Sequence, residues 1–229
     1  MKSLKKSYTI DSILYLLVCA AFTVAVRVVD TAPIGYNGQT VGFSFINDYF
    51  QKLFPYNETF YTLTQLLGYF ALLVAAAFGV FGVVQLIKRK SILEIDGDIL
   101  ALGVFYILVI ITYAVFTKVA INYRPVIIDA AEGLETSFPS SHTMLAVCVF
   151  VTAGMQIRKR IKGGLGTVLS VVCAVLAAAM IVGRIISGVH WFTDILGGIL
   201  YSCFFISVYK LLCELLKGEE PGKHDRQET

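Results

Sequence analysis

The residues of this sequence best suited to chemistry include a histidine and an aspartate near the C-terminal third. His190 and Asp194 are four residues apart, which places both on one face of a helix, where the carboxylate can accept from an imidazole N–H. Such a partner fixes the tautomer of the ring and leaves its other nitrogen free as a nucleophile or base. Arg184, six residues before His190, adds a forked donor suited to phosphate oxygens. A paired histidine without chemistry is the alternative interpretation.

A second group of polar residues surrounds the start of a predicted helix, Phe138-Pro139-Ser140-Ser141-His142. Proline is typical of the first turn of a helix, and the N–H groups of that turn are unpaired and point outwards. Together with the two serine hydroxyls, these N–H groups can bind an anion such as phosphate. A plain N-terminal cap explains the serines equally well, so this stretch is weak evidence by itself.

The elements that must position these residues are apolar helices. The 229 residues are 57% hydrophobic and 15% charged, with a mean hydropathy of +0.75, whereas soluble domains average about 45–50% apolar and about 25% charged. This composition excludes an ordinary soluble, disordered or collagen-like chain. Six segments are long or apolar enough to span a bilayer, approximately residues 12–29, 62–87, 99–117, 143–157, 165–183 and 192–213. We predict an all-α membrane protein whose single domain, residues 1–217, has six transmembrane helices and is followed by a mobile polar cytoplasmic tail, residues 218–229.

The distribution of basic residues predicts the orientation of these helices. Fourteen of the nineteen Lys and Arg residues fall at the termini and in alternate connections, and five fall on the other side. Because cytoplasmic segments carry the excess of Lys and Arg, both termini should be cytoplasmic. The connections 30–61, 118–142 and 184–191 then face the extracytoplasmic side.

Three features of the chain leave room for other interpretations. The first apolar segment follows three lysines, but it is too long for the core of a signal peptide, so we expect a retained helix. The connection 30–61 contains an amphipathic piece near residues 45–54, which fits either a position in the membrane interface or a packed cap without a catalytic part. The five cysteines lie in apolar runs without metal-ligand spacing and are interpreted as packing residues.

The predicted topology gathers the polar residues on one face of the membrane. Lys118, Arg124 and Arg184 are three of the five basic residues on the sparse side, beside His142 and His190. Charged side chains at membrane depth are energetically unfavourable and usually have a function. Each basic residue alone could also be a side chain that extends to the membrane interface without a function. Their joint position indicates a cationic site at the extracytoplasmic face.

Three segments resemble the motifs of the type 2 phosphatidic acid phosphatase (PAP2) family. They are residues 118–125 (KVAINYRP), 139–142 (PSSH) and 183–194 (GRIISGVHWFTD). The family pattern is Lys, six residues, Arg-Pro; then Pro-Ser-Gly/Ser-His; then Ser-Arg, five residues, His, three residues, Asp. The resemblance covers residues 60–213 and implies six spans, with the site on the side opposite the termini.

The resemblance also implies a role for each matching residue. His190 attacks phosphorus and becomes a phosphohistidine, Asp194 orients it, and His142 protonates the leaving oxygen and later activates water. The phosphoryl oxygens are held by Lys118, Arg124, Arg184, Ser140 and Ser141. Fixed cations then neutralise charge where a metal otherwise would, and no carboxylate cluster indicates a metal site.

Two departures from the family pattern affect these assignments. Only five residues separate Lys118 from Arg124, and each residue turns a helix by about 100°, so the direction of Lys118 is changed. Gly183 stands where the family usually has Ser, so a hydroxyl near the phosphate is either missing or replaced by backbone.

The sequence therefore predicts a cell-membrane enzyme without cofactor or metal that hydrolyses a lipid phosphate, with the bilayer as its surroundings and no nucleic acid as partner. Its substrate would be an undecaprenyl diphosphate, phosphatidic acid or phosphatidylglycerol phosphate, of which the polyprenyl diphosphate is weakly favoured. The alternatives are phosphotransfer from lipid to another acceptor with the same residues, or a catalytically silent transporter or channel.

Overall fold

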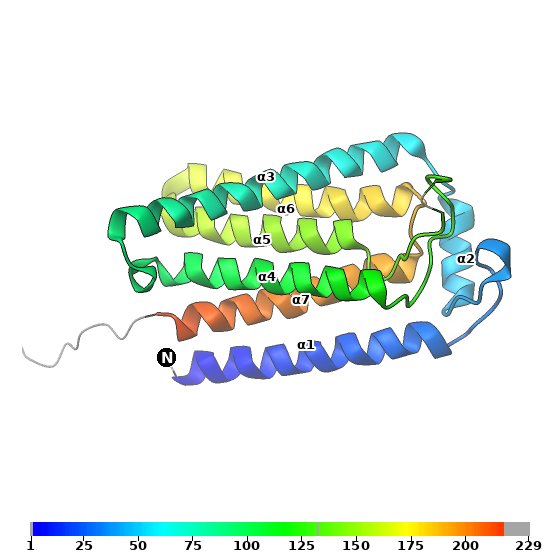
Figure 1. Cartoon of the computed structure of the whole chain (residues 1–229), viewed down its shortest axis with the longest axis horizontal. Coiled ribbons are helices and arrows are strands. Elements are labelled where there is room, and N and C mark those ends of the chain that lie inside the picture. Colours follow the sequence, from blue (N-terminus) through cyan, green and yellow to red (C-terminus); the bar gives the residue numbers. More distant parts are fainter. Residues whose placement is uncertain (1, 132, 218–229) are drawn as a thin grey trace, which may run out of the picture.

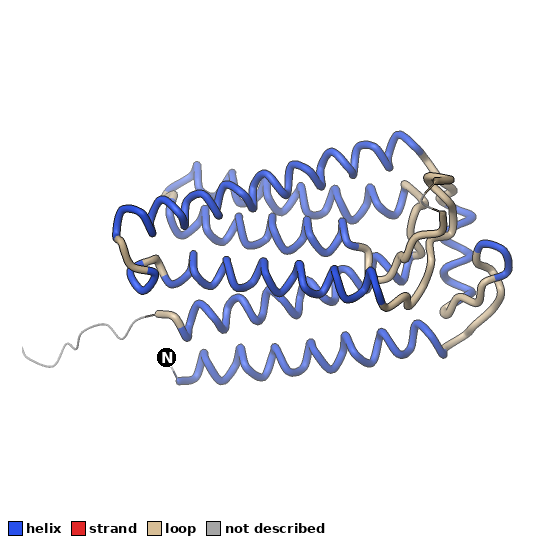
Figure 2. The backbone as a smooth tube through the Cα atoms, viewed as in Figure 1, coloured by secondary structure: helices blue, strands red, loops and turns tan. Residues whose placement is uncertain are grey.

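The computed structural model describes residues 2–131 and 133–217, and the predicted tail, residues 218–229, lies outside them. The described residues form seven α-helices and no β-strand. The helices are α1 (Lys2–Val28), α2 (Ser44–Leu53), α3 (Glu58–Arg89), α4 (Gly97–Lys118), α5 (Ser141–Arg160), α6 (Gly163–Ile186) and α7 (Phe192–Leu215). Six of them run side by side, whereas α2 lies across one end of the bundle (Figure 1). The longest loops gather at that same end (Figure 2).

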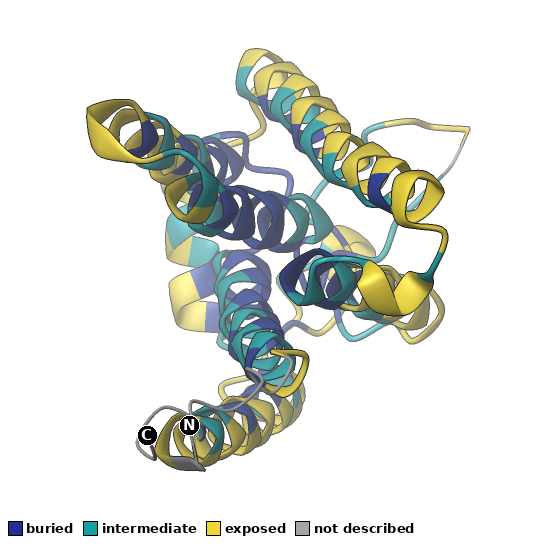
Figure 3. Ribbon diagram, turned by 90° about the vertical axis from the view of Figure 1, so that its left-hand side faces the viewer, coloured by how far each residue is buried: buried dark blue, intermediate teal, exposed yellow. Residues whose placement is uncertain are grey.

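Most of the six helices that lie side by side have the composition of membrane spans. Among the described residues, α1, α3, α4, α6 and α7 are long and apolar enough to cross a membrane. The outer faces of α1, α3, α4 and α6 are exposed (Figure 3) and carry side chains such as Leu17, Leu73, Ile110 and Val168, whereas α7 is covered along most of its length. Exposed apolar surface on this scale requires a lipid environment, so the chain is a membrane protein.

Helix α5 covers the fourth predicted span, residues 143–157, but it is not among the helices apolar enough to qualify by composition. It packs against α3, α4, α6 and α7. Most of its residues are buried, including the polar Thr152 and Gln156. A helix shielded by its neighbours does not face lipid, so its polar side chains need only partners within the protein. Gln156 finds one in Tyr209 of α7.

At the end of the bundle away from α2, an ionic cluster joins the start of α4 to the ends of α3 and α5. The buried carboxylate of Asp98 at the start of α4 accepts hydrogen bonds from Lys159 Nζ at 2.8 Å and Arg160 Nη1 at 3.0 Å, at the end of α5. Arg89 at the end of α3 pairs with Asp96 at 2.8 Å. Helix α1 begins and α7 ends at this end of the bundle (Figure 1).

Helix α2 forms most of the amphipathic piece near residues 45–54, and it turns the polar side chains of Asn47 and Gln51 towards the protein. The buried Asn47 donates to the carbonyl of Gly42 and to Thr193 Oγ1, and it accepts from the N–H of Thr193. Gln51 donates to the carbonyl of Gly188 at 3.2 Å. Phe45 points outwards and is 82% exposed. The polar face of α2 therefore holds the α6–α7 connection and the first turn of α7.

Candidate active site

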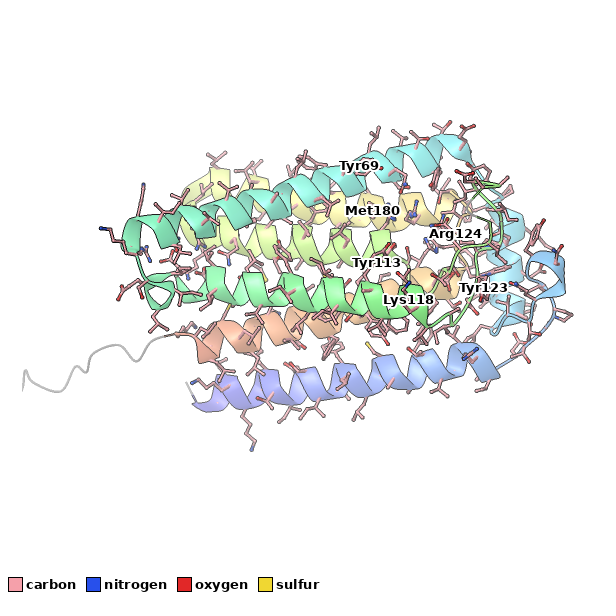
Figure 4. All side chains as sticks on the ribbon, in the orientation of Figure 1. Tyr69, Tyr113, Lys118, Tyr123, Arg124 and Met180 are labelled. Carbon is pink, nitrogen blue, oxygen red and sulfur yellow. The ribbon has the colours of Figure 1, made fainter. Side chains whose placement is uncertain are left out.

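The polar residues predicted from the sequence meet at the end of the bundle covered by α2. His142 is the second residue of α5, Arg184 lies in the last turns of α6, and Asp194 lies in the first turn of α7. His190 belongs to the short connection between α6 and α7, and Arg124 to the loop 119–140 (Figure 4). All five residues except His142 are buried.

The tight turn before His190 depends on a glycine. Gly188 adopts a φ of +63°, which favours glycine. A Cβ at this position would also lie 2.5 Å from the carbonyl oxygen of Phe54 and 2.6 Å from the backbone of Pro55. The turn therefore passes directly beside the segment that follows α2, and this packing fixes where His190 points.

Arg184 is the centre of the site. Its side chain is fully buried, and its Nη2 lies 3.1 Å from His142 Nδ1 and 3.4 Å from His190 Nε2. Its Nη1 donates to Thr64 Oγ1 at 3.0 Å, and its guanidinium stands 5.6 Å from the centre of the Tyr61 ring. Because a guanidinium can only donate, the two imidazole nitrogens that face it present lone pairs.

His190 and Asp194 lie next to each other as their spacing predicts. His190 Nδ1 is 3.8 Å from Asp194 Oδ2, longer than a hydrogen bond, and such contacts are commonly long in ligand-free sites and shorten when substrate binds. Asp194 accepts from the N–H of Trp191 at 3.0 Å and from Asn122 Nδ2 at 3.3 Å. Burial is the main cause that holds the pKa of His190 well below its usual value, with contributions from the charges of Arg184 and Arg124. The imidazole is therefore neutral at neutral pH.

The loop 119–140 lies over the site, and its two sides are joined by an isolated β-bridge between Tyr123 and Thr136. The N–H of Arg124 donates to the carbonyl of Glu135, and the N–H of Ser137 to the carbonyl of Asn122. Trp191 Nε1 donates to the carbonyl of Tyr123 at 2.8 Å and ties the loop to the start of α7. Arg124 Nη1 lies 3.2 Å from Glu135 Oε2 as an ion pair, but without the alignment of a hydrogen bond.

The two serines of the second motif occupy different positions. Ser140 is fully buried, its N–H donates to the carbonyl of Asp194, and its Oγ accepts from Thr143 Oγ1. Its N–H is thus already used, and only the hydroxyl hydrogen is left for a ligand. Ser141 lines a cavity together with His142, and the N–H groups of this first turn lack a helical acceptor.

Lys118 is the predicted site residue that the structure does not bring to the others. It lies in the last turn of α4 (Figure 4), is exposed, and makes no hydrogen bond or ion pair with any residue that the structure describes. Helix α4 ends at Lys118, so the five residues between Lys118 and Arg124 belong to the loop and not to the helix.

Helix α3 supplies site residues that the sequence analysis missed. Thr64 contacts Arg184, and Gly68, four residues later on the same face, leaves room for the ring of His142, whose Cδ2 would lie 2.9 Å from an added Cβ. The only sequence signal was a polar and a small residue in an apolar span, and this pattern is common in membrane helices. Asn122, which contacts Asp194, was also missed although it lies inside the first motif.

A cavity of about 360 Å³ leads from the flank of the bundle to the site. It lies among α3, α4 and α5, and its lining includes Gly68, Leu72, Ile110 and His142. Tyr69 and Tyr113 lie on α3 and α4 at its outer side (Figure 4) and are 60% and 52% exposed. An amphiphile can therefore reach His142 sideways from the apolar surroundings of the helices.

Several buried polar atoms have no hydrogen-bond partner among the residues that the structure describes. They are Nε of Arg184, Nε and Nη1 of Arg124, Nδ1 of His190, Oγ of Ser137 and Oε1 of Gln65. His190 Nδ1 faces Asp194. The arginine nitrogens are donors and Ser137 Oγ can donate, and unpaired buried donors are costly unless a ligand accepts from them. Within the described part of the chain, no group of three or more His, Cys, Asp or Glu residues could hold a metal ion. The arrangement suits an oxyanion surrounded by N–H and O–H groups.

These features define a helical membrane protein with a buried cationic site at one end of its bundle. The model of the PAP2 superfamily matches residues 40–214, and the chain belongs to this superfamily. Among solved structures, the chain is similar to the crystal structure of a transmembrane PAP2-type phosphatidylglycerolphosphate phosphatase from Bacillus subtilis. The two share 19% identity with a TM-score of 0.59, over 91% of this chain and 94% of the other. A search of curated proteins gives no match.

Proposed function

We propose that this protein is a metal-independent phosphatase of membrane lipid phosphates. Membership of the PAP2 superfamily supports phosphatase chemistry at the level of the family. The observation that carries the proposal is Arg184, a fully buried guanidinium that has no carboxylate within ion-pair distance among the described residues. A buried unpaired charge is strongly unfavourable, and a bound phosphoryl group would supply the missing negative charge.

The cavity on the flank supports a lipid as the carrier of that phosphoryl group. Its lining is mostly apolar, and it ends at His142 and Ser141. A lipid tail would remain among the apolar side chains of α3 and α4, while the headgroup phosphate reaches Arg184. A small soluble phosphate would gain nothing from this apolar approach.

In the proposed mechanism, His190 Nε2 attacks phosphorus and the bond from phosphorus to the leaving oxygen breaks. Asp194 stabilises the resulting phosphohistidine through Nδ1, and His142 in its protonated form delivers a proton to the leaving oxygen and becomes neutral. Water, deprotonated by His142, then attacks phosphorus and releases phosphate with regeneration of His190. Arg184, Arg124 and the first turn of α5 stabilise the charge on the phosphoryl oxygens during both steps.

The orientation in the membrane follows from the charges and the fold together. The basic runs after α3 and α5 lie at the end of the bundle away from the site, where α1 begins and α7 ends (Figure 1). By the positive-inside rule this end is cytoplasmic. We therefore propose that α5 spans the cell membrane together with the five helices that qualify by composition, which gives six spans. The site then lies at the extracytoplasmic face.

The candidate substrates share a phosphate or diphosphate at the outer headgroup level. They are undecaprenyl diphosphate, phosphatidic acid and phosphatidylglycerol phosphate. We favour the polyprenyl diphosphate because that lipid must be recycled on the outer face.

The test is phosphate release by the purified protein in detergent against these three lipids and a short-chain soluble phosphate, with and without a strong chelator. We expect release from a lipid, unaffected by the chelator and blocked by vanadate. Loss of activity with the chelator and its recovery with magnesium would contradict a metal-independent site. Phosphate that appears on an acceptor and not in solution would indicate a phosphotransferase.

A further inference from the structure

Thr64 is the only side chain outside the three motifs that hydrogen-bonds Arg184 among the described residues. It is 3% exposed, lies on α3, and accepts from Arg184 Nη1 at 3.0 Å. Its own hydroxyl hydrogen is directed to the carbonyls of Phe60 and Tyr61, both at 2.9 Å. These contacts fix the rotamer of Thr64 and leave an oxygen lone pair for the guanidinium.

The position of Thr64 depends on the absence of a side chain at residue 183. A Cβ added to Gly183 would lie 2.6 Å from Thr64 Cγ2, far inside van der Waals contact. The methyl group cannot move away freely, because threonine is stiff at χ1 and its hydroxyl is held by the backbone of α3. Gly183 and Thr64 are therefore a matched pair across the α3–α6 contact.

The contact decides which way the guanidinium faces. With Nη1 held by Thr64, Nη2 is directed between His142 and His190. The Nε–H and the second Nη1 hydrogen have no acceptor among the described residues. A planar guanidinium has fixed donor directions, so fixing one edge fixes the rest.

We infer that Thr64 is a positioning residue for phosphate binding, which holds the guanidinium of Arg184 in place through its hydroxyl in a space that Gly183 leaves open. This inference rests on the proposed function, since it concerns the same phosphate site. Thr64 itself does not touch the reacting atoms.

The experiment compares four variants with the wild-type protein by phosphate release, by vanadate inhibition and by melting temperature. Thr64→Val keeps the shape but removes the acceptor, and should lower kcat/KM and weaken vanadate inhibition by about 10- to 100-fold, as expected when a buried charged donor loses its partner. Thr64→Ser keeps the hydroxyl and should retain most of both. Gly183→Ala should be impaired by collision with the Thr64 methyl, and Thr64→Ser combined with Gly183→Ala should recover.

Two matched controls come from the same helices. Thr62→Val lies on the exposed side of α3, and Gly164→Ala lies in the first turn of α6, where an added Cβ meets nothing within 4 Å. Both should behave as wild type.

The outcomes separate this inference from the proposed function. Equal impairment of Thr64→Val and Thr64→Ser, or a Thr64→Val protein with wild-type vanadate inhibition, would overturn the role of the hydroxyl. If Thr64→Val does not fold, failure of the double variant to recover would overturn the pairing with Gly183. A wild-type protein that neither releases phosphate nor binds vanadate, measured as a shift in melting temperature, would instead overturn the proposed function.

Discussion

The charges around His190 can be measured through the pH at which the activity falls on the acid side. An attacking imidazole must be unprotonated, and its pKa lies well below the usual value because of burial and the nearby charges of Arg184 and Arg124. The acid limb of the pH profile of kcat/KM, which reports the free enzyme, should therefore lie below about 6.5.

The first prediction follows from the sign of this shift. Arg124→Gln removes a positive charge that lowers the pKa of His190, so that pKa should rise and the acid limb should move to higher pH. The overall rate should also fall, because the phosphoryl oxygens lose a hydrogen-bond donor. Arg27→Gln, an exposed arginine at the end of α1, should leave the profile unchanged. An acid limb that stays in place or moves to lower pH in Arg124→Gln would be inconsistent with this electrostatic coupling.

The second prediction separates the two histidines by the leaving group of the substrate. His190→Ala should form no acid-labile phosphoenzyme and release no phosphate from any substrate. His142→Ala should lose about 100- to 10,000-fold with a lipid, as expected for a general acid, but less with a nitrophenyl phosphate, whose leaving group needs no proton. Because His142 also activates water, a burst followed by a slow steady rate should appear with the aryl substrate. A phosphoenzyme in His190→Ala that is absent from His142→Ala would exchange the two roles.

At the scale of residues, the sequence revealed those whose type and spacing carry chemistry. His190 and Asp194 are close together in the fold because a helix brings positions four apart to one face. Thr64 could not be predicted, because its partner Arg184 is 120 residues away in the sequence and nothing local distinguishes it from other threonines of an apolar span. Lys118 was assigned by its place among the basic residues of the sparse side and by the first motif, and neither pattern shows that its side chain remains exposed and apart from the other site residues.

At the scale of elements, α2 is attached to the α6–α7 connection and to the first turn of α7 by a few hydrogen bonds. Asn47 is fully buried, and its side-chain amide binds the N–H of Thr193, next to Asp194, and the carbonyl of Gly42. The helix therefore helps to hold the first turn of α7 in place.

The third prediction tests this attachment. Asn47→Ala should lower the free energy of unfolding by about 1–3 kcal/mol, the cost of leaving buried backbone groups unpaired, and should reduce activity, because the turn that carries Asp194 loses support. Melting temperature and phosphate release in the same detergent measure both effects. Asp48→Ala on the exposed side of α2 loses only a surface ion pair with Lys52 and should change stability by less than about 1 kcal/mol. A melting temperature equal to that of the wild type would mean that α2 is held by other contacts.

The apolar pattern predicted the elements better where they face lipid than where they face protein. Helices α1, α3, α4 and α6 show long apolar stretches because their exposed outer sides have no other solvent than lipid. Helix α5 is less apolar because its neighbours surround it, so Thr152 and Gln156 are accommodated by hydrogen bonds inside the bundle. The order in which the helices pack, with α5 at the centre, depends on contacts between distant segments and could not be read from hydropathy.

At the scale of the whole molecule, the charge distribution and the bundle make one prediction about sidedness. In a background without the five native cysteines, cysteines introduced at Thr59 and Ala131, at the site end, should react with an impermeant thiol reagent on intact cells. A cysteine at Gly164, at the opposite end, should react only after the membrane is opened. All three positions are exposed and lie outside the middle of the spans. Labelling of Gly164→Cys alone on intact cells would invert the orientation.

The position of Arg184 Nη2 between two imidazole lone pairs bears on which membrane lipids can react. At rest, Arg184 hydrogen-bonds both His142 and His190, so the same contact that positions the nucleophile also occupies it. An entering phosphoryl group must accept the Nη2 hydrogens in place of the imidazoles before His190 can attack, while Thr64 keeps its contact with Nη1. A terminal phosphate, with a charge of about −1.5 to −2 at pH 7, can do so, whereas the diester of an ordinary phospholipid carries a single charge and is shielded by substituents on both sides. On the proposed function, we expect the diester lipids of the bilayer to leave the site inactive, so vesicles of phosphatidylglycerol alone should remain intact in the presence of the protein.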